Sequence, residues 1–282
     1  MISIRTMTLV DIHAGLSLCR QAGWNQLARD WELFLTLNPE GCRVALNETG
    51  TVVGTVTTLP YQDHFTWIGM VLVDPEHRRQ GIGTQLLNEA LQITGNDSTV
   101  KLDATPAGRE VYLKLNFIDE YRIDRMYLNR PHANILPVTT ARPARASDFP
   151  AIVKLDLDVF GADRRRVLES NFKGAPEYGF VIEAHDEVKG FCLGRPGYNF
   201  NHIGPVVAEN TTEAIQLLSA ALRVQEEKPV VMDILDHTSE WRSFVSSVGF
   251  VVLRPLLRMY RGSNEYAGIP KKQFAIVGPE FG

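Results

Sequence analysis

The chain has 282 residues, of which 44% are hydrophobic and 22% charged, and its formal net charge at pH 7 is -4. This composition is typical of a folded globular protein, and the negative net charge argues against nucleic acid or an acidic membrane as a partner. Cys19, Cys42 and Cys192 show no paired metal-ligand spacing and form an odd set, so neither a metal site nor a disulfide framework is expected. The opening residues do not resemble a signal peptide, and no apolar run approaches about 20 residues, so we expect a cytoplasmic protein.

Hydrophobic periodicity predicts alternating strands and helices along residues 1–130. In chain order we expect strand 2–7, helices 10–22 and 27–37, strands 42–47, 52–59 and 67–73, helix 84–94, strand 99–104, helix 107–115 and strand 123–129. Such a series indicates an α/β fold in which helices pack against a mixed sheet.

The turn between strand 67–73 and helix 84–94 carries the clearest chemical signal. Pro75 ends the strand, and the run Arg78-Arg79-Gln80-Gly81-Ile82-Gly83 leads into the helix. The first amides of a helix have no acceptor within it and lie at the positive end of its dipole, while glycines let a phosphate approach the backbone. The pattern therefore predicts an anion site. A purely steric need for glycine in a tight turn is the alternative.

The chain repeats itself once. Arg5, Asp11, Ala14 and Leu18 recur at a constant offset as Arg142, Asp148, Ala151 and Leu155. Later, Leu102-Asp103-Ala104-Thr105 is echoed by Leu235-Asp236-His237-Thr238, and Phe117 and Arg125-Met126-Tyr127 by Phe250 and Arg258-Met259-Tyr260. We therefore predict two tandem domains, a first repeat (residues 1–130) and a second repeat (residues 141–282), joined by a proline-containing linker at 131–140.

Two motifs of the first repeat resemble those of the GCN5-related N-acetyltransferases (GNATs). The run from Val71 to Gly83 is similar to the family's acetyl-coenzyme A signature, and the run from Thr105 to Phe117 is similar to its following strand and helix motif. The resemblance implies two GNAT domains with mostly antiparallel sheets, and acetyl-coenzyme A as co-substrate without a metal. The donor-binding residues that it implies are Val71, Leu72, Val73, Arg78, Arg79, Gln80, Gly81, Ile82, Gly83, Thr84 and Thr105. Among these, Thr105 stands where the family often has asparagine.

Tyr112 matches the tyrosine that, by the same resemblance, supplies a proton to the departing thiolate and is therefore the predicted catalytic residue. The alternative is an aromatic packing residue on a buried helix face. No general base is assigned. Asp63, His64 and Asp103 are nearby candidates, and a helix-capping role is the simpler expectation for Asp103.

The acceptor site is expected near residues 22–32, by resemblance to the family. One helical stripe is formed by Trp24, Leu27, Trp31 and Phe34. It indicates either core packing or an aromatic wall beside Asp30 or Glu32 that would suit a cation. Trp24, Asp30 and Trp31 are the predicted acceptor-binding residues of the first repeat.

The second repeat lacks the features that would bind a donor. Its segment from Glu209 to Ile215 aligns with the phosphate turn but is four residues shorter, without the glycines or the arginine pair, and Val245 replaces Tyr112. It is expected either to complete the acceptor pocket through Arg195 and Asp233 or to act only as a packing partner.

Taken together, the motifs predict an N-acetyltransferase that transfers an acetyl group from acetyl-coenzyme A to a primary amine of a small molecule. Transfer is expected to be direct, within a ternary complex. The alternative is an acyl-coenzyme A sensor or regulatory protein that binds the donor without turnover, and Tyr112 favours the enzyme because a sensor needs no acid.

Overall fold

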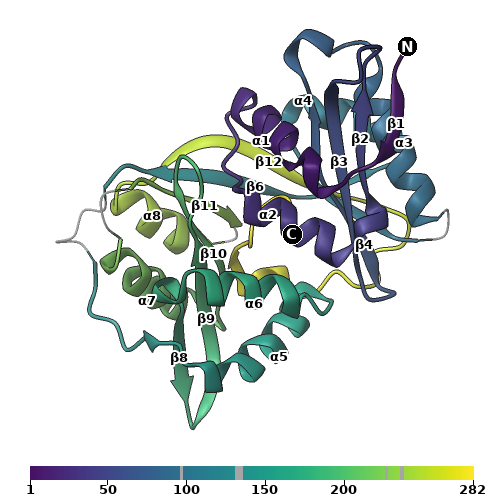
Figure 1. Cartoon of the computed structure of the whole chain (residues 1–282). Helices are drawn as coiled ribbons and strands as arrows, with labels where there is room; N and C mark the ends of the chain where they lie inside the picture. Colours follow the sequence, from purple (N-terminus) through teal and green to yellow (C-terminus); the bar gives the residue numbers. More distant parts are fainter. Residues whose placement is uncertain (96–97, 131–135, 226–227, 236–237) are drawn as a thin grey trace.

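The computed structural model describes residues 1–95, 98–130, 136–225, 228–235 and 238–282 (Figure 1). The elements of the first repeat are β1 (Ser3–Thr6), α1 (Ile12–Gln21), α2 (Ala28–Leu37), β2 (Cys42–Leu46), β3 (Val52–Tyr61), β4 (Phe65–Val73), α3 (Ile82–Thr94), β5 (Val100–Ala104), α4 (Pro106–Leu113) and β6 (Ile118–Leu128). Every predicted helix and strand of this repeat is present, and β6 begins five residues earlier than expected, at Ile118 rather than at residue 123.

The second repeat follows the same order. Its elements are β7 (Arg142–Pro143), α5 (Phe149–Phe160), α6 (Arg165–Gly174), β8 (Phe180–Ala184), β9 (Glu187–Arg195), β10 (Asn201–Val207), α7 (Thr211–Arg223), β11 (Val230–Leu235), α8 (Ser239–Ser247), β12 (Val251–Arg261) and β13 (Gln273–Ala275). Residues 131–135 of the predicted linker lie outside the described residues. The described part is held against α7, where the Arg223 guanidinium donates to the carbonyl of Leu136 at 2.9 Å.

Equivalent ion pairs confirm the internal repeat. The Arg5 guanidinium bonds Asp11 at 2.8 Å before α1, and the Arg142 guanidinium bonds Asp148 at 2.7 Å before α5. The Phe117 amide donates to the carbonyl of Tyr112 at 3.1 Å, and the Phe250 amide donates to that of Val245 at 3.2 Å. Val245 is therefore the structural counterpart of Tyr112.

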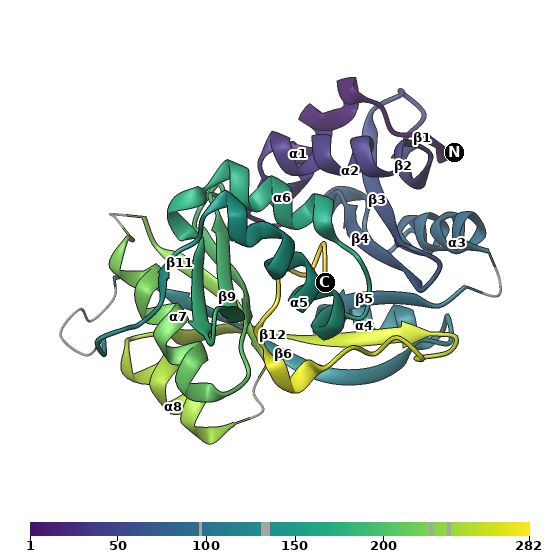
Figure 2. The same cartoon turned by 90° about the horizontal axis from the view of Figure 1, so that it is seen from below.

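The described strands form one sheet in the order β1-β2-β3-β4-β5-β12-β6-β11-β13-β10-β9-β8-β7. All neighbours are antiparallel except the pairs β4 with β5 and β10 with β11, which confirms a mixed, mostly antiparallel sheet. Strand β12 lies between β5 and β6, while β6 pairs with β11. Each repeat thus contributes its long strand to the sheet of the other, and Figures 1 and 2 show β6 and β12 running side by side between the two halves. The contiguous bounds 1–130 and 141–282 remain a prediction, because these strands cross them.

A shared core holds the helices α1 and α2 of the first repeat against α5 and α6 of the second. Trp31 and Phe34 of α2 belong to the same buried cluster as Ile152 of α5 and Leu168 of α6. The ring of Phe281 stacks on Phe34 with centroids 4.7 Å apart, which places the segment 278–282 between the repeats. Helices α3 and α4 cover the opposite face of the first repeat, with Leu86, Leu87 and Tyr112 in a separate cluster.

The strands β4 and β5 pair only at their beginning and then separate. Their register joins Thr66 to Val100 and Trp67 to Lys101, and no later residue of β4 pairs with a described residue of β5. The sheet therefore opens between the ends of these two strands, and this opening positions the candidate site.

Candidate active site

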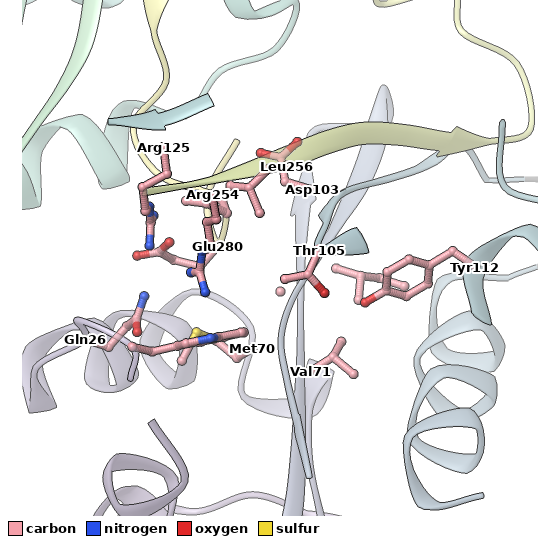
Figure 3. Close-up of a pocket in the computed structure, with 14 residues that line it drawn as sticks. Gln26, Met70, Val71, Asp103, Thr105, Tyr112, Arg125, Arg254, Leu256 and Glu280 are labelled. Atoms are coloured by element: carbon pink, nitrogen blue, oxygen red, sulfur yellow. The ribbon is translucent and has the colours of Figure 1, made fainter. Parts of the chain in front are cut away.

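A cavity of about 70 Å³ lies in the opening between β4 and β5 (Figure 3). Residues from both repeats line it: Trp24, Gln26, Ile68, Gly69, Met70, Val71, Asp103, Thr105, Tyr112, Arg125, Arg254, Leu256, Pro279 and Glu280. Figure 3 shows Thr105 and Tyr112 towards one end of the cavity, and Gln26, Arg125, Arg254 and Glu280 towards the other. We call these the tyrosine end and the arginine end.

A bulge in β4 shapes one wall of the cavity. Leu72 pairs with Thr55 and Gly69 pairs with Thr57, so Met70 and Val71 together oppose the single residue between these positions on β3. Met70 has a φ of 52°, an unusual value for a side chain of this size. The Thr55 hydroxyl, which donates to the carbonyl of Met70 at 2.8 Å, stabilises this conformation. Bulges re-aim backbone groups next to active sites, and this one directs the Met70–Val71 backbone toward the opening.

The predicted phosphate turn is exposed, and several of its backbone amides have no acceptor inside the helix. The bond from the Gln85 amide to the carbonyl of Gly81, at 3.0 Å, closes the first turn of α3. The amides of residues 81–84 therefore have no acceptor inside the helix. Arg79 and Gly81 both have positive φ, 61° and 79°, which curls the backbone into a concave loop. Arg78 bonds the carbonyl of Val73 at 3.1 Å through Nε, which ties the turn to the end of β4.

The two glycines of the turn differ in whether the backbone requires them. Gly81 occupies the left-handed region at φ 79°, where a side chain is strained. Gly83 has ordinary backbone geometry, and a Cβ placed on it would meet only Val73 Cγ2, at 3.6 Å. No described residue therefore requires glycine at position 83, and the missing side chain leaves the backbone there accessible.

Tyr112 is buried on α4, and burial raises the pKa of its hydroxyl to about 12. Its ring packs on Phe117 with centroids 5.7 Å apart, while the hydroxyl points toward the tyrosine end of the cavity (Figure 3). The hydroxyl has no hydrogen-bond partner in the part of the chain that the structure describes, so it is free to bond a ligand. The packing role and the proton-donor role are therefore compatible.

Thr105 caps α4 and also lines the cavity. Its hydroxyl accepts a hydrogen bond from the Gly108 amide at 3.2 Å. The expectation that Asp103 caps this helix is wrong, because the Asp103 carboxylate is held by both Nε and Nη2 of Arg258, each at 2.9 Å. Burial raises the pKa of Asp103, and the charge of Arg258 opposes this effect. Asp63 and His64, the other base candidates, line a different cavity beyond the β3–β4 turn.

Of the predicted acceptor-binding residues of the first repeat, only Trp24 lines the cavity. Trp31 is fully buried, with its ring against Gly15, so the structure places it in the core rather than in the site. For Trp31, the stripe therefore serves core packing. Asp30 is also buried, and it accepts from the Leu27 amide at 2.7 Å at the start of α2.

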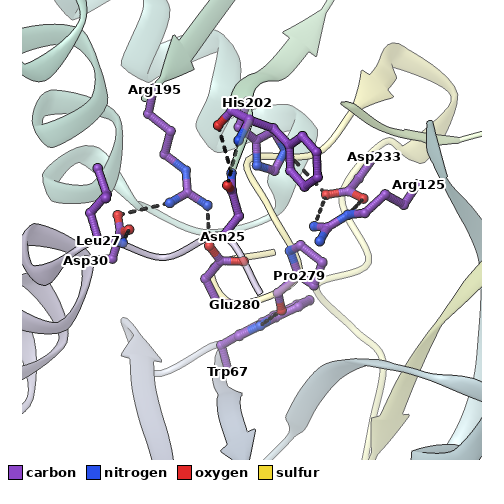
Figure 4. Close-up of polar contacts among 11 residues, drawn as sticks. Asn25, Leu27, Asp30, Trp67, Arg125, Arg195, His202, Asp233, Pro279 and Glu280 are labelled. Atoms are coloured by element: carbon purple, nitrogen blue, oxygen red, sulfur yellow. Dashed lines mark hydrogen bonds and ion pairs between the residues drawn. The ribbon is translucent and has the colours of Figure 1, made fainter. Parts of the chain in front are cut away.

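Arg195 and Asp233 do not line the cavity. Figure 4 shows them in contact with Glu280 and Arg125, two residues of its arginine end. The Arg195 guanidinium bonds Asp30 at 2.9 Å and also pairs with Glu280, whereas Asp233 holds Arg125 through two bonds of 2.7 Å. Burial acts to raise the pKa of Glu280, but the charges of Arg195, His202 and Arg125 and a hydrogen bond from Gln26 together lower that pKa below its ordinary value. Glu280 is therefore an anion at the cavity wall, and Arg195 and Asp233 position cavity residues without reaching the cavity themselves.

Among the polar lining residues, Gln26 lies within the predicted segment 22–32, whereas Arg125, Arg254 and Glu280 were not predicted as site residues. Arg125 was noticed only as part of the repeat, and nothing local to the segment 278–282 marks Glu280 as a site residue. The Trp67 indole donates to the carbonyl of Pro279 at 2.9 Å, which fixes this segment against β4. Gly69 allows the approach, since a Cβ there would meet the Glu280 carbonyl oxygen at 2.8 Å.

The corresponding opening in the second repeat is filled by the chain itself. Strands β10 and β11 pair at Asn201 with Val230 and His202 with Val231, and β13 then inserts between them. Helix α7 is capped by the Asn210 side chain, which accepts from the Glu213 amide at 3.0 Å. A strand occupies the gap and a side chain occupies the helix end, so this repeat offers no space for a ligand at the equivalent position.

No group of His, Cys, Asp or Glu side chains suited to holding a metal ion is found among the described residues. None of the helices in the described ranges has the length and apolar character needed to cross a bilayer.

Family models match both repeats. The model described as "Acetyltransferase (GNAT) family" matches residues 10–117, and that described as "Acetyltransferase (GNAT) domain" matches residues 152–275. The holothin acyltransferase of Pseudoalteromonas sp. (strain SANK 73390) is 27% identical over 261 residues, covering 92% of this chain and 87% of that protein. The uncharacterized N-acetyltransferase YitH of Bacillus subtilis (strain 168) is 26% identical over 238 residues, covering 83% of each chain.

A solved structure has the same fold over the whole length. The crystal structure of a proposed acetyltransferase from Pyrococcus horikoshii superposes with a TM-score of 0.81 at 24% identity, covering 100% of this chain and 96% of that one. This likeness concerns the fold, while the two family models and the named relatives concern the chemistry. The chain therefore belongs to the GNAT family and is an acyltransferase built from two GNAT domains in tandem.

Proposed function

We propose that the protein transfers an acetyl group from acetyl-coenzyme A to a primary amine of a small molecule, directly and within a ternary complex. The observation that carries this proposal is the cavity itself. It brings the free hydroxyl of Tyr112, the Met70–Val71 bulge and the carboxylate of Glu280 into one lining. These groups match the needs of acyl transfer: a proton donor, a backbone site for a carbonyl, and an anion beside a nitrogen that gains positive charge.

The donor would bind only in the first repeat. The amides of residues 79–84, together with Arg78 and Arg79, would hold the pyrophosphate at the start of α3. The free edge of β4 at residues 71–73 and Thr105 would line the arm that carries the thioester into the opening. Tyr112 then lies at the end of the cavity nearest to this path.

In the reaction, the amine nitrogen forms a bond to the thioester carbon and the carbon–sulfur bond breaks. Tyr112 donates its proton to the departing thiolate, the attacking nitrogen gives up one of its protons to solvent water, and Tyr112 regains a proton from the solvent, so the products are the amide and the free thiol. Its raised pKa keeps it protonated at neutral pH, so the donor form is the resting form. Glu280, kept ionised by Arg195, stabilises the positive charge that develops on the nitrogen during attack.

A panel of primary amines incubated with acetyl-coenzyme A, followed by thiol release and by mass of the product, tests this function. At least one amine should give amine-dependent thiol release with an equal amount of N-acetylated product. Donor binding without thiol release for any amine would instead indicate the acyl-coenzyme A sensor.

A further inference from the structure

We propose that Arg254 binds a carboxylate of the acceptor, so that the acceptor is a small molecule carrying both an amine and a carboxylate group. This inference rests on the proposed function and names the class of its acceptor. It follows from the Arg254 guanidinium at the arginine end, which has no ion-pair partner among the described residues.

Arg254 is the only charged side chain of the described cavity lining without an ion-pair partner. Asp103 is held by Arg258, Arg125 by Asp233, and Glu280 by Arg195. Arg254 makes no hydrogen bond or ion pair with any described residue, and its Nε is buried without an acceptor. A buried guanidinium nitrogen without an acceptor is costly to keep, and a bound anion would remove that cost.

The strand register explains why the protein does not satisfy Arg254 itself. Arg254 of β12 lies directly opposite Arg125 of β6, whose other neighbour across the sheet is Asp233 of β11. Asp233 gives both carboxylate oxygens to Arg125, so Arg254 faces a like charge, an arrangement that is unfavourable unless an anion is added. Burial and the charge of Arg125 lower the pKa of Arg254, while Asp233 and Glu280 attract it only from beyond bonding distance.

A bulge in β12 presents this side chain to the cavity. Val252 pairs with Met126 and Arg254 pairs with Arg125, so Leu253 is an extra residue in the strand. Arg254 and Leu256 then alternate onto the face that lines the cavity. Bulges beside a site change the direction of a side chain, and this one turns the Arg254 guanidinium toward the cavity. The guanidinium is planar, and its paired N–H donors match the two oxygens of a carboxylate.

The position of Arg254 assigns the anion to the acceptor. In Figure 3, Arg254 lies at the arginine end beside Glu280, with Thr105 and Tyr112 at the other end of the cavity. The phosphates of the donor would bind at the start of α3, outside this lining. An acceptor whose amine lies near Glu280 and whose carboxylate lies near Arg254 satisfies both groups at once.

The test compares matched acceptors that differ only in charge: β-alanine with β-alaninamide, and 4-aminobutyrate with 4-aminobutyramide. With the wild-type protein, kcat/KM for the carboxylate of at least one pair should exceed that for its amide by about 10- to 100-fold. Arg254→Met, which keeps the apolar stem, should lower kcat/KM for the carboxylate acceptor to about that for its amide. Arg254→Lys should retain part of the difference between carboxylate and amide. Arg261→Met on the same strand but outside the cavity is the matched control and should behave as wild type.

Glutarate, which has no amine, gives a readout independent of turnover. Calorimetry should show it bound about 10-fold or more tightly to the wild type than to Arg254→Met. If Arg254→Met does not fold, glutarate affinity is compared between the wild type, Arg254→Lys and Arg254→Gln instead.

The two proposals fail in different ways. Thiol release with equal carboxylate-to-amide ratios in wild type and Arg254→Met would overturn the anion site and leave the acetyltransferase standing. Glutarate binding that depends on Arg254, without thiol release for any amine, would support the anion site and overturn the acetyltransferase. If Arg254→Met instead changed the preference between succinyl- and propionyl-coenzyme A, the anion would belong to the donor and the acceptor proposal would be wrong.

Discussion

Arg258 of β12 lies directly opposite Asp103 of β5, and two bonds of 2.9 Å join the guanidinium to the carboxylate. The other repeat shows the reciprocal pair, in which Arg125 of β6 lies opposite Asp233 of β11. Each pair joins an arginine of one repeat to an aspartate of the other, and the side chains of both pairs are buried. The exchange of the long strands is thus fixed by two buried ion pairs that border the same cavity.

Removing one partner of the first pair should be costly. Arg258→Met leaves Asp103 buried without its counterion, so the free energy of unfolding should fall by about 3–5 kcal/mol. Asp103→Asn combined with Arg258→Met should recover part of this loss, because no charge is then buried. Urea unfolding measures both. Arg109→Met, which breaks the exposed pair with Asp119, is the control and should change stability little.

The two repeats should unfold together. Strands β6 and β12 each complete the sheet of the other repeat, and α2 shares a core with α5 and α6. Scanning calorimetry should therefore give a single transition whose calorimetric and van't Hoff enthalpies agree. Two separated transitions would show that the repeats are independent despite the exchange.

Tyr112→Phe should lower kcat by about 100-fold or more and leave donor affinity nearly unchanged, because the proton is needed only in the transition state. The ring contact with Phe117 is kept in this variant. Turnover and coenzyme A binding are measured in parallel, with Tyr127→Phe on β6 as the control. Unchanged turnover in Tyr112→Phe would assign the acid to another group.

Gly83→Val should weaken donor binding by about 100-fold or more, because the side chain would occupy the space where the backbone amides meet phosphate. The fold should survive, since the Cβ meets only Val73 at an ordinary contact distance. Gln85→Val places the same residue type two residues further along α3 and controls for the cost of a β-branched side chain in a helix. Calorimetry should give one site per wild-type chain. A second equal site would contradict the filled opening between β10 and β11.

Alkaline pH should destabilise the protein partly through Tyr112. Its pKa is about 12 in the folded protein and about 10 in an unfolded chain. From pH 10 to 12 the unfolded chain releases this proton while the folded protein keeps it, so stability falls as pH rises, by about 1.4 kcal/mol per unit of pKa difference. Urea midpoints at pH 8 and 11 should therefore differ less in Tyr112→Phe than in wild type.

The repeat could be read from the sequence only in part. The pairs Arg5–Asp11 and Arg142–Asp148 and the helix caps Thr105 and Thr238 are equivalent in the structure, as their spacing predicts. The echo of Asp103 is a different matter. Asp236, matched by spacing, lies outside the described residues, and the structural counterpart of Asp103 is Asp233, which pairs with the arginine of the other repeat. The aspartate of the second repeat lies three residues earlier in the sequence than the spacing predicts, although the helix caps Thr105 and Thr238 keep that spacing.

The sequence by itself determined the local elements, the glycine turn before α3 and the place of Tyr112, because hydrophobic period, turn chemistry and helix capping act between near neighbours. Only the tertiary structure decided which long strand completes which sheet. Strand β12, rather than β6 of the same repeat, pairs with β5, and this pairing depends on contacts between residues more than a hundred positions apart. The position of β12 places Arg254 in the cavity lining, and the packing of residues 278–282 against β4 places Glu280 there. Trp31 lies in a core shared by both repeats. Long-range packing leaves no periodic trace in the sequence, which is why the glycine turn and the position of Tyr112 could be predicted, whereas the residues at the arginine end of the cavity could not.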